Sequence, residues 1–369
     1  MRLERKILIW AIATAAIAWL VYLLSGAIAP FAAGIALGYL LDPVVRRMQA
    51  LGLSRLVASL IILVVFILVV ALLLLIAAPA LANQFASFAQ KLPGYAMKLQ
   101  SLAVDQSRAL LERYGGELRA SGWALPADQI QKSVGDFVAQ GAQWLLNFLR
   151  SLVSGGAAIF GFLSFLIITP VVAFYILVDW NKMVATIDGW LPLAHRDTLR
   201  GIAAEINDAL AGFIRGQSLV CLFLGLWYGV GLTLVGLDFG LLIGVIAGVL
   251  SFIPYVGSLT ALILSLIVGL VQGWPSLTLF FSALAVVLAG QFLEANVVSP
   301  KLVGGSIGLH PVWLMFALFA FGELFGFTGL LIAVPTAAAL GVCARHLIGL
   351  YLNSSLYHGA AQTNAPEAP

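Results

Sequence analysis

The stretch that decides the fold reads Gly248-Val-Leu-Ser-Phe-Ile-Pro254-Tyr-Val-Gly257, and the apolar segment that contains it runs on to Gly273. A helix rises about 1.5 Å per residue, and roughly 20 residues cross a hydrocarbon core about 30 Å thick. The segment is longer than one crossing needs, and it contains a proline and glycines that break helices. We therefore expect a broken membrane helix that tilts steeply, extends beyond the bilayer or turns back as a hairpin.

A second long apolar segment begins at Val312 and continues through Pro335. It is interrupted by Gly322-Glu323-Leu-Phe-Gly326, which places a carboxylate and two glycines inside an apolar run. Backbone groups freed by such breaks are tolerated at membrane depth only inside protein or beside water. In transporters, discontinuous helices of this kind mark the substrate or ion site. The two broken segments together therefore predict a transport pathway.

A polar linker joins the two broken segments. It begins with Glu294-Ala-Asn296-Val-Val-Ser-Pro300-Lys301 and ends with His310. If each broken segment crosses the bilayer once, the linker is external. If each is a re-entrant hairpin, the linker is cytoplasmic. Lys301 favours the hairpin arrangement, because basic residues accumulate in cytoplasmic loops.

The composition is that of a membrane protein. Hydrophobic residues make up 62% of the chain and charged residues only 9%, which excludes a soluble globular protein. The formal net charge of +3 is small and the basic residues are scattered, so no nucleic-acid partner is expected. Cys221 and Cys343 lie in apolar runs and suit packing rather than a disulfide or a metal site. We expect an all-α polytopic membrane protein with about eight membrane segments, some of them broken or re-entrant in the C-terminal half.

Charge and hydropathy divide the chain into six expected parts. These are three N-terminal membrane helices, an extracytoplasmic helical insert, a fourth membrane helix, a cytoplasmic amphipathic helix, a C-terminal membrane core with broken helices and a disordered cytoplasmic tail. Their expected bounds are 1–79, 80–150, 151–178, 179–216, 217–349 and 350–369. Pro79 and Gly115-Gly116 are expected to end helices. The insert is interpreted as a gate, an oligomer contact or a partner platform, or else as helices lying on the bilayer surface.

Basic residues set the expected orientation. They lie at positions 2, 5 and 6 before the first two apolar runs, and at Arg46 and Arg47 after them. The positive-inside rule places both flanks in the cytoplasm. The first run is interpreted as a membrane helix rather than a signal peptide, because a second run follows almost at once. Gly34 and Gly38, four residues apart in that second run, predict the close approach of a partner helix.

Glu323 is the first candidate for chemistry. An ionisable group at the centre of a lone membrane helix costs about 2.5–3.5 kcal/mol on insertion scales, so its presence suggests a proton or cation site. The alternative is a solvated carboxyl group at the tip of a turn that plays no part in transport. His310, at the start of a helix, is interpreted either as a proton acceptor or as a simple polar contact.

Five further residues are candidates for the substrate or ion pathway. Glu294 and Asn296 end a span beside Pro300, where they would contact a polar solute or cap neighbouring helix ends. Pro254 and Gly257 would free backbone carbonyls for a ligand, or would form a tight turn without one. Pro300 is included in the pathway as the residue that ends this span.

Small residues at intervals of four predict tight helix packing. Gly240, Gly244 and Gly248 form one such ridge, and Gly322 and Gly326 form a shorter pair. Ridges of this kind join two copies of a chain or two helices within one chain. A homo-oligomer is expected, and both uses of the ridges stay open.

The sequence contains neither a Gly-x-x-x-x-Gly-Lys-Ser/Thr nucleotide loop nor a His-Glu-x-x-His metal motif. No means of hydrolysing ATP is visible. We therefore expect neither an enzyme, nor a cofactor, nor a bound metal, and any uphill transport would be driven by an ion gradient.

Five runs of residues, in this order along the chain, resemble the pattern of a known family. They are Arg215-Gly216-Gln217, Phe252-Ile-Pro254-Tyr-Val-Gly257, Glu294-Ala-Asn296-Val-Val-Ser-Pro300-Lys301, Gly308-Leu-His310-Pro311 and Gly329-Leu-Leu-Ile-Ala-Val-Pro335. The family is the AI-2E family of PerM-like membrane proteins, and the resemblance covers almost the whole chain. It implies about eight spans and a bacterial inner-membrane transporter. Some members are associated with export of the quorum-sensing signal autoinducer-2, and others with sodium(lithium)/proton antiport.

These observations lead to one functional hypothesis and its alternatives. The chain is interpreted as a secondary transporter that exports a small polar solute such as autoinducer-2, coupled to a proton or sodium ion. It would sit in the lipid bilayer of the bacterial inner membrane with both termini in the cytoplasm. The alternatives are a sodium(lithium)/proton antiporter, a passive channel, and a membrane scaffold that acts through its external insert.

Overall fold

The computed structural model describes residues 25–120, 156–304 and 308–358, together with positions 132, 135, 136, 140, 141 and 143. Every regular element in these ranges is helical, which confirms the predicted all-α class. The first apolar run, residues 1–24, and the break expected at 124–126 lie outside the described residues.

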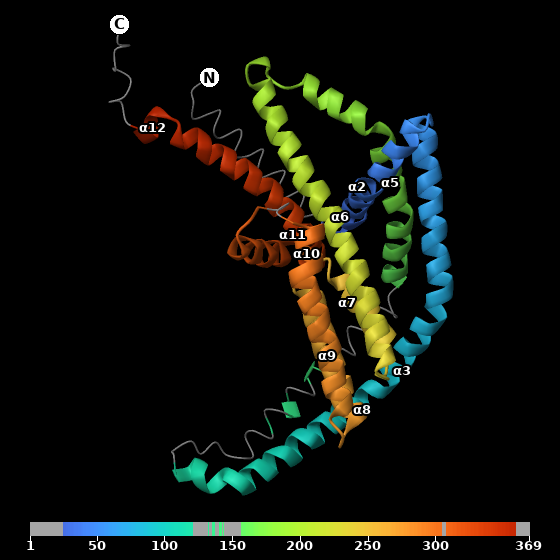
Figure 1. The fold of residues 1–369 in the computed structure, drawn as a ribbon, viewed down its shortest axis with the longest axis vertical. Coiled ribbons are helices and arrows are strands. Elements are labelled where there is room, and N and C mark those ends of the chain that lie inside the picture. The colour runs from blue at the N-terminus through green and yellow to red at the C-terminus, as the bar shows by residue number, and fades with distance from the viewer. Residues whose placement is uncertain are drawn as a thin grey trace. The chain divides into compact units, whose positions relative to one another are not determined.

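Figure 1 shows the helices in their order along the chain. Their bounds are α2 Ser25–Ala50, α3 Arg55–Ala120, α5 Gly156–Gly189, η1 Leu193–His195, α6 Arg196–Leu234, α7 Gly240–Leu250, α8 Val256–Gly273, α9 Thr278–Leu293, η2 Glu294–Val298, α10 Ser299–Leu302, α11 Pro311–Leu352 and α12 Ser355–His358. Within the described residues, seven helical stretches are long and apolar enough to cross a membrane, and α7 is a shorter apolar helix. The chain is therefore a multi-pass membrane protein.

Helix α3 is longer than the sequence predicts. It runs from Arg55 to Ala120 without a break and passes through Pro79, Pro93 and Gly115-Gly116. The expectation that Pro79 and the glycine pair end helices was therefore wrong. A proline removes one backbone donor, and strong helix formers such as alanine and leucine on both sides carry the helix across it.

Two other expected boundaries also differ. Helix α6 begins at Arg196 and continues to Leu234, so the amphipathic stretch and the next apolar span are one helix. Helix α11 continues to Leu352 and α12 follows it, so the first residues of the expected tail are helical. Residues 359–369 lie outside the described part.

The described residues form two compact units, and each is discontinuous in sequence. Unit 1 takes those of ranges 1–67, 164–220 and 295–369, and unit 2 takes those of ranges 68–163 and 221–294. Each unit is described separately below. This division crosses the linear parts expected from hydropathy, because helices α3, α5 and α6 each contribute to both units.

Unit 1 has a core between α2, the start of α3 and α5. Leu41, Val45, Ala58, Ala173 and Leu177 are buried there. The close approach expected at Gly34 and Gly38 is made by α5, because a Cβ at Gly38 would lie 2.7 Å from Ile176 Cγ2. Within the same unit, α11 packs on α2.

Unit 2 is built on the glycine ridge of α7. Gly240, Gly244 and Gly248 face α6, where Gly244 meets Gly229, Gly248 meets Gly225, and Gly240 meets the backbone at Leu232 and Thr233. A Cβ at Gly248 would lie 2.5 Å from the Gly225 Cα, and one at Gly244 would overlap the Gly229 backbone. Two antiparallel helices with glycine on both sides thus bring their backbones into contact. Helices α7, α8 and α9 then pack in succession, with α8 beside α9 (Figure 1).

Candidate functional site

The first broken segment is a helical hairpin, which we call the first hairpin: α7, a turn at residues 251–255, and α8. Helix α7 has only 11 residues and would span about 16 Å at 1.5 Å per residue. A Cβ on Gly257 would overlap the Ala247 carbonyl and the Ser251 hydroxyl. Residues ten apart in one straight helix could not meet in this way, so the chain turns back.

The turn of the first hairpin holds two of the predicted pathway residues. Pro254 lies within it, and Gly257 is buried just inside α8. Tyr255 between them has φ 68°, in the left-handed region that bulky residues rarely adopt. Ser251 Oγ donates to the Ala247 carbonyl at 2.7 Å. The enclosed side of this turn therefore satisfies its own polar groups.

The second broken segment is also a hairpin, which we call the second hairpin: α11 with its turn at Gly326, where φ is 60° and ψ is −140°. Helix α11 is accordingly not one straight rod (Figure 1). A Cβ on Gly329 would overlap the Phe321 carbonyl, and one on Gly322 would lie 3.0 Å from Leu330 Cδ2. Its two arms therefore face each other across the turn. Nothing lies within 4 Å of a Cβ on Gly326, so this residue forms the turn rather than the helix contact expected of it.

Glu323 lies three residues before the turn of the second hairpin. Its side chain is exposed, as are Leu324 and Phe327 on either side of Gly326. It forms no hydrogen bond or ion pair with any residue in the described ranges. The carboxylate thus sits at a hairpin tip and is free to meet a solute or an ion.

Glu294 occupies a different kind of break. It opens the five-residue π-helix η2 that follows α9, and π-helical turns are frequent at functional sites. The Glu294 side chain is half-buried, in the same unit as Tyr228 of α6. Tyr228 is fully buried, and its hydroxyl has no hydrogen-bond partner among the described residues. A buried hydroxyl without a protein partner is expected to find water or a ligand.

The remaining linker residues are placed as follows. Asn296 lies in η2 and Pro300 in α10, and both are exposed. His310 caps α11, with its Nδ1 accepting from the Val312 amide at 3.3 Å. That hydrogen bond gives His310 a structural role in starting the helix. The run from Gly304 to Gly308 also has Gly-x-Ser-x-Gly spacing, but that motif acts at a strand-to-helix turn, and the regular elements described before and after the run are the helices α10 and α11.

The two units divide the predicted pathway residues. Pro254, Gly257 and Glu294 belong to unit 2. The others, Asn296, Pro300, His310 and Glu323, belong to unit 1. Within unit 1, Arg345 of α11 binds the linker, because its Nη1 donates to the Gly308 carbonyl at 3.4 Å. Its Nη2 donates to Glu205 of α6 at 2.8 Å. No group of three His, Cys, Asp or Glu side chains in the described part is arranged to hold a metal ion.

The start of the predicted insert is tied to the ends of the hairpin helices in unit 2. Lys91 and Tyr95 of α3 bind Asp238 in the turn before α7, at 2.8 and 3.2 Å. Phe88 packs edge-on against Phe239 with ring centroids 5.2 Å apart. A movement of this part of α3 would thus be transmitted to α7.

Sequence reasoning missed a polar cavity in unit 1. It lies between α2, α5 and α6 and is lined by Tyr39, Asp42, Arg46, Trp180, Asn207 and Arg215. The sequence singled out Arg215, as part of the Arg215-Gly216-Gln217 run, and Arg46, as a flanking basic residue, but grouped neither with the cavity. The lining residues come from ranges 38–46, 176–180 and 207–215, so no local pattern could have grouped them.

The helices, the hairpins and the glycine packing define an all-α, multi-pass membrane protein with re-entrant segments. A model of the AI-2E family of transporters matches residues 7–349, and the chain belongs to this family. It is 29% identical to the Bacillus subtilis protein named "Putative transport protein YrrI", over 86% of each chain. It is also 29% identical to "Putative permease PerM" of Escherichia coli K12, over 87% of each chain.

Proposed function

We propose that this protein is a secondary transporter of the bacterial inner membrane that exports a small polar solute at the expense of an ion gradient. Autoinducer-2 is the first candidate solute, and a proton or sodium ion is the candidate for coupling. The N- and C-termini would lie in the cytoplasm. The family supports transport in general, and the finer assignment rests on the residues of this chain.

The observation that carries the proposal is the pair of re-entrant hairpins. Each one leaves turn backbone between two apolar arms, at residues 251–255 and at Gly326. Such backbone persists in a membrane only where protein or water surrounds it, and transporters place their sites at helices broken in this way. We therefore assign the pathway to Pro254, Gly257, Glu294, Asn296, Pro300, His310 and Glu323.

Two carboxylates are available to carry a coupling ion. Glu323 is exposed at the tip of the second hairpin, whereas Glu294 is half-buried at the start of η2. A carboxylate that alternates between a wet and an enclosed environment binds and releases a proton or cation. We assign the coupling role to Glu323 and a solute-contacting role to Glu294.

The test is flux in proteoliposomes under imposed proton and sodium gradients, with autoinducer-2 and lithium offered in turn. Wild type, Glu323→Gln, Glu294→Gln and Pro254→Ala would be compared with Asp197→Asn. Asp197 is a matched control, because its carboxylate is fully exposed at the start of α6 and its nearest cation is 3.8 Å away. We expect gradient-driven flux in wild type and control, and a loss of at least tenfold in Glu323→Gln.

The other outcomes assign other functions. Lithium flux that depends on pH and vanishes in Glu323→Gln, without autoinducer-2 flux, would identify a sodium(lithium)/proton antiporter. Flux that needs no gradient would identify a passive channel. No flux from folded protein would refute the proposal and favour a scaffold that acts through the insert. Homo-oligomerisation stays a prediction without support from the α7 ridge, because α6 of the same chain occupies that ridge.

A further inference from the structure

The polar cavity of unit 1 is formed by residues of three helices, α2, α5 and α6. It is partly open, and its volume is about 30 Å³. A cavity of roughly 10–15 Å³ by this measure accommodates one water molecule, so this one has room for about two oxygen atoms of a ligand, and it is open on one side for the remainder. Gly38 on α2 and Ala211 on α6 are small residues among those that line it.

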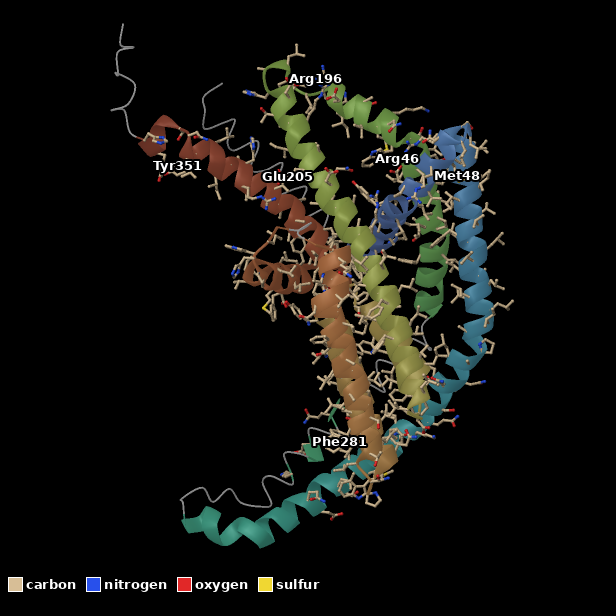
Figure 2. All side chains as sticks on the ribbon, viewed as in Figure 1. Arg46, Met48, Arg196, Glu205, Phe281 and Tyr351 are labelled. Carbon is tan, nitrogen blue, oxygen red and sulfur yellow. The ribbon has the colours of Figure 1, made fainter. Side chains whose placement is uncertain are left out.

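Positive charge at the cavity exceeds negative charge. Asp42 is the single acidic side chain that lines it, and two arginines already share that carboxylate. Arg46 binds it at 2.7 Å and the largely buried Arg55 at 3.2 Å. Arg46 extends from the C-terminal part of α2 (Figure 2). Asp42 is therefore neutralised without any contribution from Arg215.

Arg215 is held in place but has no acidic partner in the described part of the chain. Its Nε donates to the Tyr39 carbonyl at 3.0 Å, which leaves the four N–H bonds of its two terminal nitrogens uncommitted. The neighbouring acids are occupied: Asp179 pairs with Lys182 at 3.1 Å, and Asp208 accepts from Asn207 at 3.3 Å. A fixed guanidinium with free donors is the group that binds carboxylates and phosphates in pairs of hydrogen bonds.

The walls around Arg215 are organised by further contacts. The Tyr39 hydroxyl donates to Asn207 Oδ1 at 3.1 Å, and the Tyr39 ring meets Trp180 edge-on with centroids 5.7 Å apart. Next to Arg215, Gly216 lets the chain at Leu302 and Val303 approach, since a Cβ there would lie 2.9 Å from the Val303 Cα. The guanidinium is thus positioned before any ligand arrives, and little entropy is lost on binding.

The cavity lies where apolar helix gives way to polar residues. On α2 the apolar run ends at Asp42 and Arg46, and on α5 it ends at Asp179. Such transitions mark the level of the lipid headgroups. Anionic headgroups at this level are attracted to clustered arginines.

We propose that this cavity binds one phosphate-type oxyanion, with both terminal nitrogens of Arg215 donating to its oxygens and Arg46 at the rim. The ligand is either the phosphate of an anionic lipid headgroup or a free anion of the same chemistry. The site is separate from the transport pathway assigned above and does not depend on it.

The test measures binding to the full-length protein in detergent and does not require transport. In one arm, inorganic phosphate is titrated at constant ionic strength and the thermal unfolding midpoint is followed. In the other, the protein is placed in nanodiscs of phosphatidylcholine with or without phosphatidylglycerol, and retained lipid is counted by native mass spectrometry. The variants are Arg215→Gln and Arg215→Lys. Arg47→Gln is the matched control, because it removes the same charge from an exposed residue of α2 that does not line the cavity.

Saturable binding of phosphate or retention of phosphatidylglycerol in wild type and Arg47→Gln, weakened about tenfold or more in Arg215→Gln, would support the site. Lysine keeps the positive charge but lacks the planar set of donors with which arginine binds two oxygens at once. The Arg215→Lys variant should therefore bind the anion several-fold more weakly than wild type. The arm that responds identifies the source of the ligand, and Arg215→Lys keeps the test valid if Arg215→Gln does not fold. Binding that is absent from wild type in both arms, or equal in Arg215 variants and control, would overturn the proposal.

Discussion

The first hairpin is enclosed by its own unit, whereas the tip of the second hairpin is open. Six of the 11 residues of α7 are buried, and the turn that follows includes buried Ser251 and Ile253. Around Gly326, by contrast, Glu323, Leu324 and Phe327 are exposed. Both hairpins nevertheless close on a buried glycine, Gly257 in one and Gly329 in the other.

This difference shows that a break in an apolar segment can serve two purposes. A break whose helices are packed against a neighbouring helix fixes their position, because the neighbouring backbone must move before they can. A break with an exposed tip keeps its polar groups available. The comparison therefore suggests that the first hairpin anchors unit 2 and that the second presents Glu323.

The largest expected effect is at the interface that encloses the first hairpin. Gly244→Ala would place a methyl group into the Gly229 backbone, which cannot yield as a side-chain end can. We expect a loss of about 3 kcal/mol or failure to fold, measured by chemical unfolding in detergent and size-exclusion chromatography. Gly225→Ala is the matched control, because its Cβ would have no atom closer than 3.5 Å and should cost less than about 1 kcal/mol. Equal tolerance of both changes would show that α7 is not locked against α6.

The next effect tests whether both segments really turn back. Gly257→Ala and Gly329→Ala would each drive a methyl group into the opposite arm of its hairpin, at a cost of about 2 kcal/mol each. Gly322→Ala serves as the control, since its Cβ would meet only the flexible Leu330 side chain, at 3.0 Å, and should cost about 1 kcal/mol or less. The thermal unfolding midpoints of the three variants test whether both segments turn back. A harmless Gly329→Ala would mean that α11 crosses without folding back, and the comparison would fail.

The smallest effect concerns the left-handed residue at each tip. Gly326 has φ 60° and ψ −140° in open space, so Gly326→Ala should cost about 1 kcal/mol or more through backbone strain alone. Tyr255 adopts φ 68° with an exposed side chain, so Tyr255→Gly should stabilise the protein by up to about 1 kcal/mol. Opposite shifts of the unfolding midpoint are expected. Shifts of the same sign would mean that lost side-chain contacts, not the backbone, dominate at one of the tips.

Much of the fold could be predicted from residues close together in the sequence. Apolar length predicted membrane helices, and the Pro254 and Gly326 runs predicted the two breaks. The glycines of α7 predicted close packing, because their spacing of four puts them on one face of a helix. Prediction failed at Pro79, where the single proline was given more weight than the strong helix formers on both sides of it. It also missed the grouping of Tyr39 with Asn207 and Arg215, because no spacing rule connects residues so far apart.

The sequence by itself determined that this is an all-α, multi-pass membrane protein of the AI-2E family with two broken segments, because hydropathy, helix breakers and motif order are local properties. Only the tertiary structure decided that each break is a hairpin, that α6 is the partner of the Gly244 ridge, and that Arg215 lines a cavity. Those facts depend on which distant backbones come within van der Waals reach of each other. Which backbones meet depends on all of these contacts together, so no single stretch of the sequence specifies it.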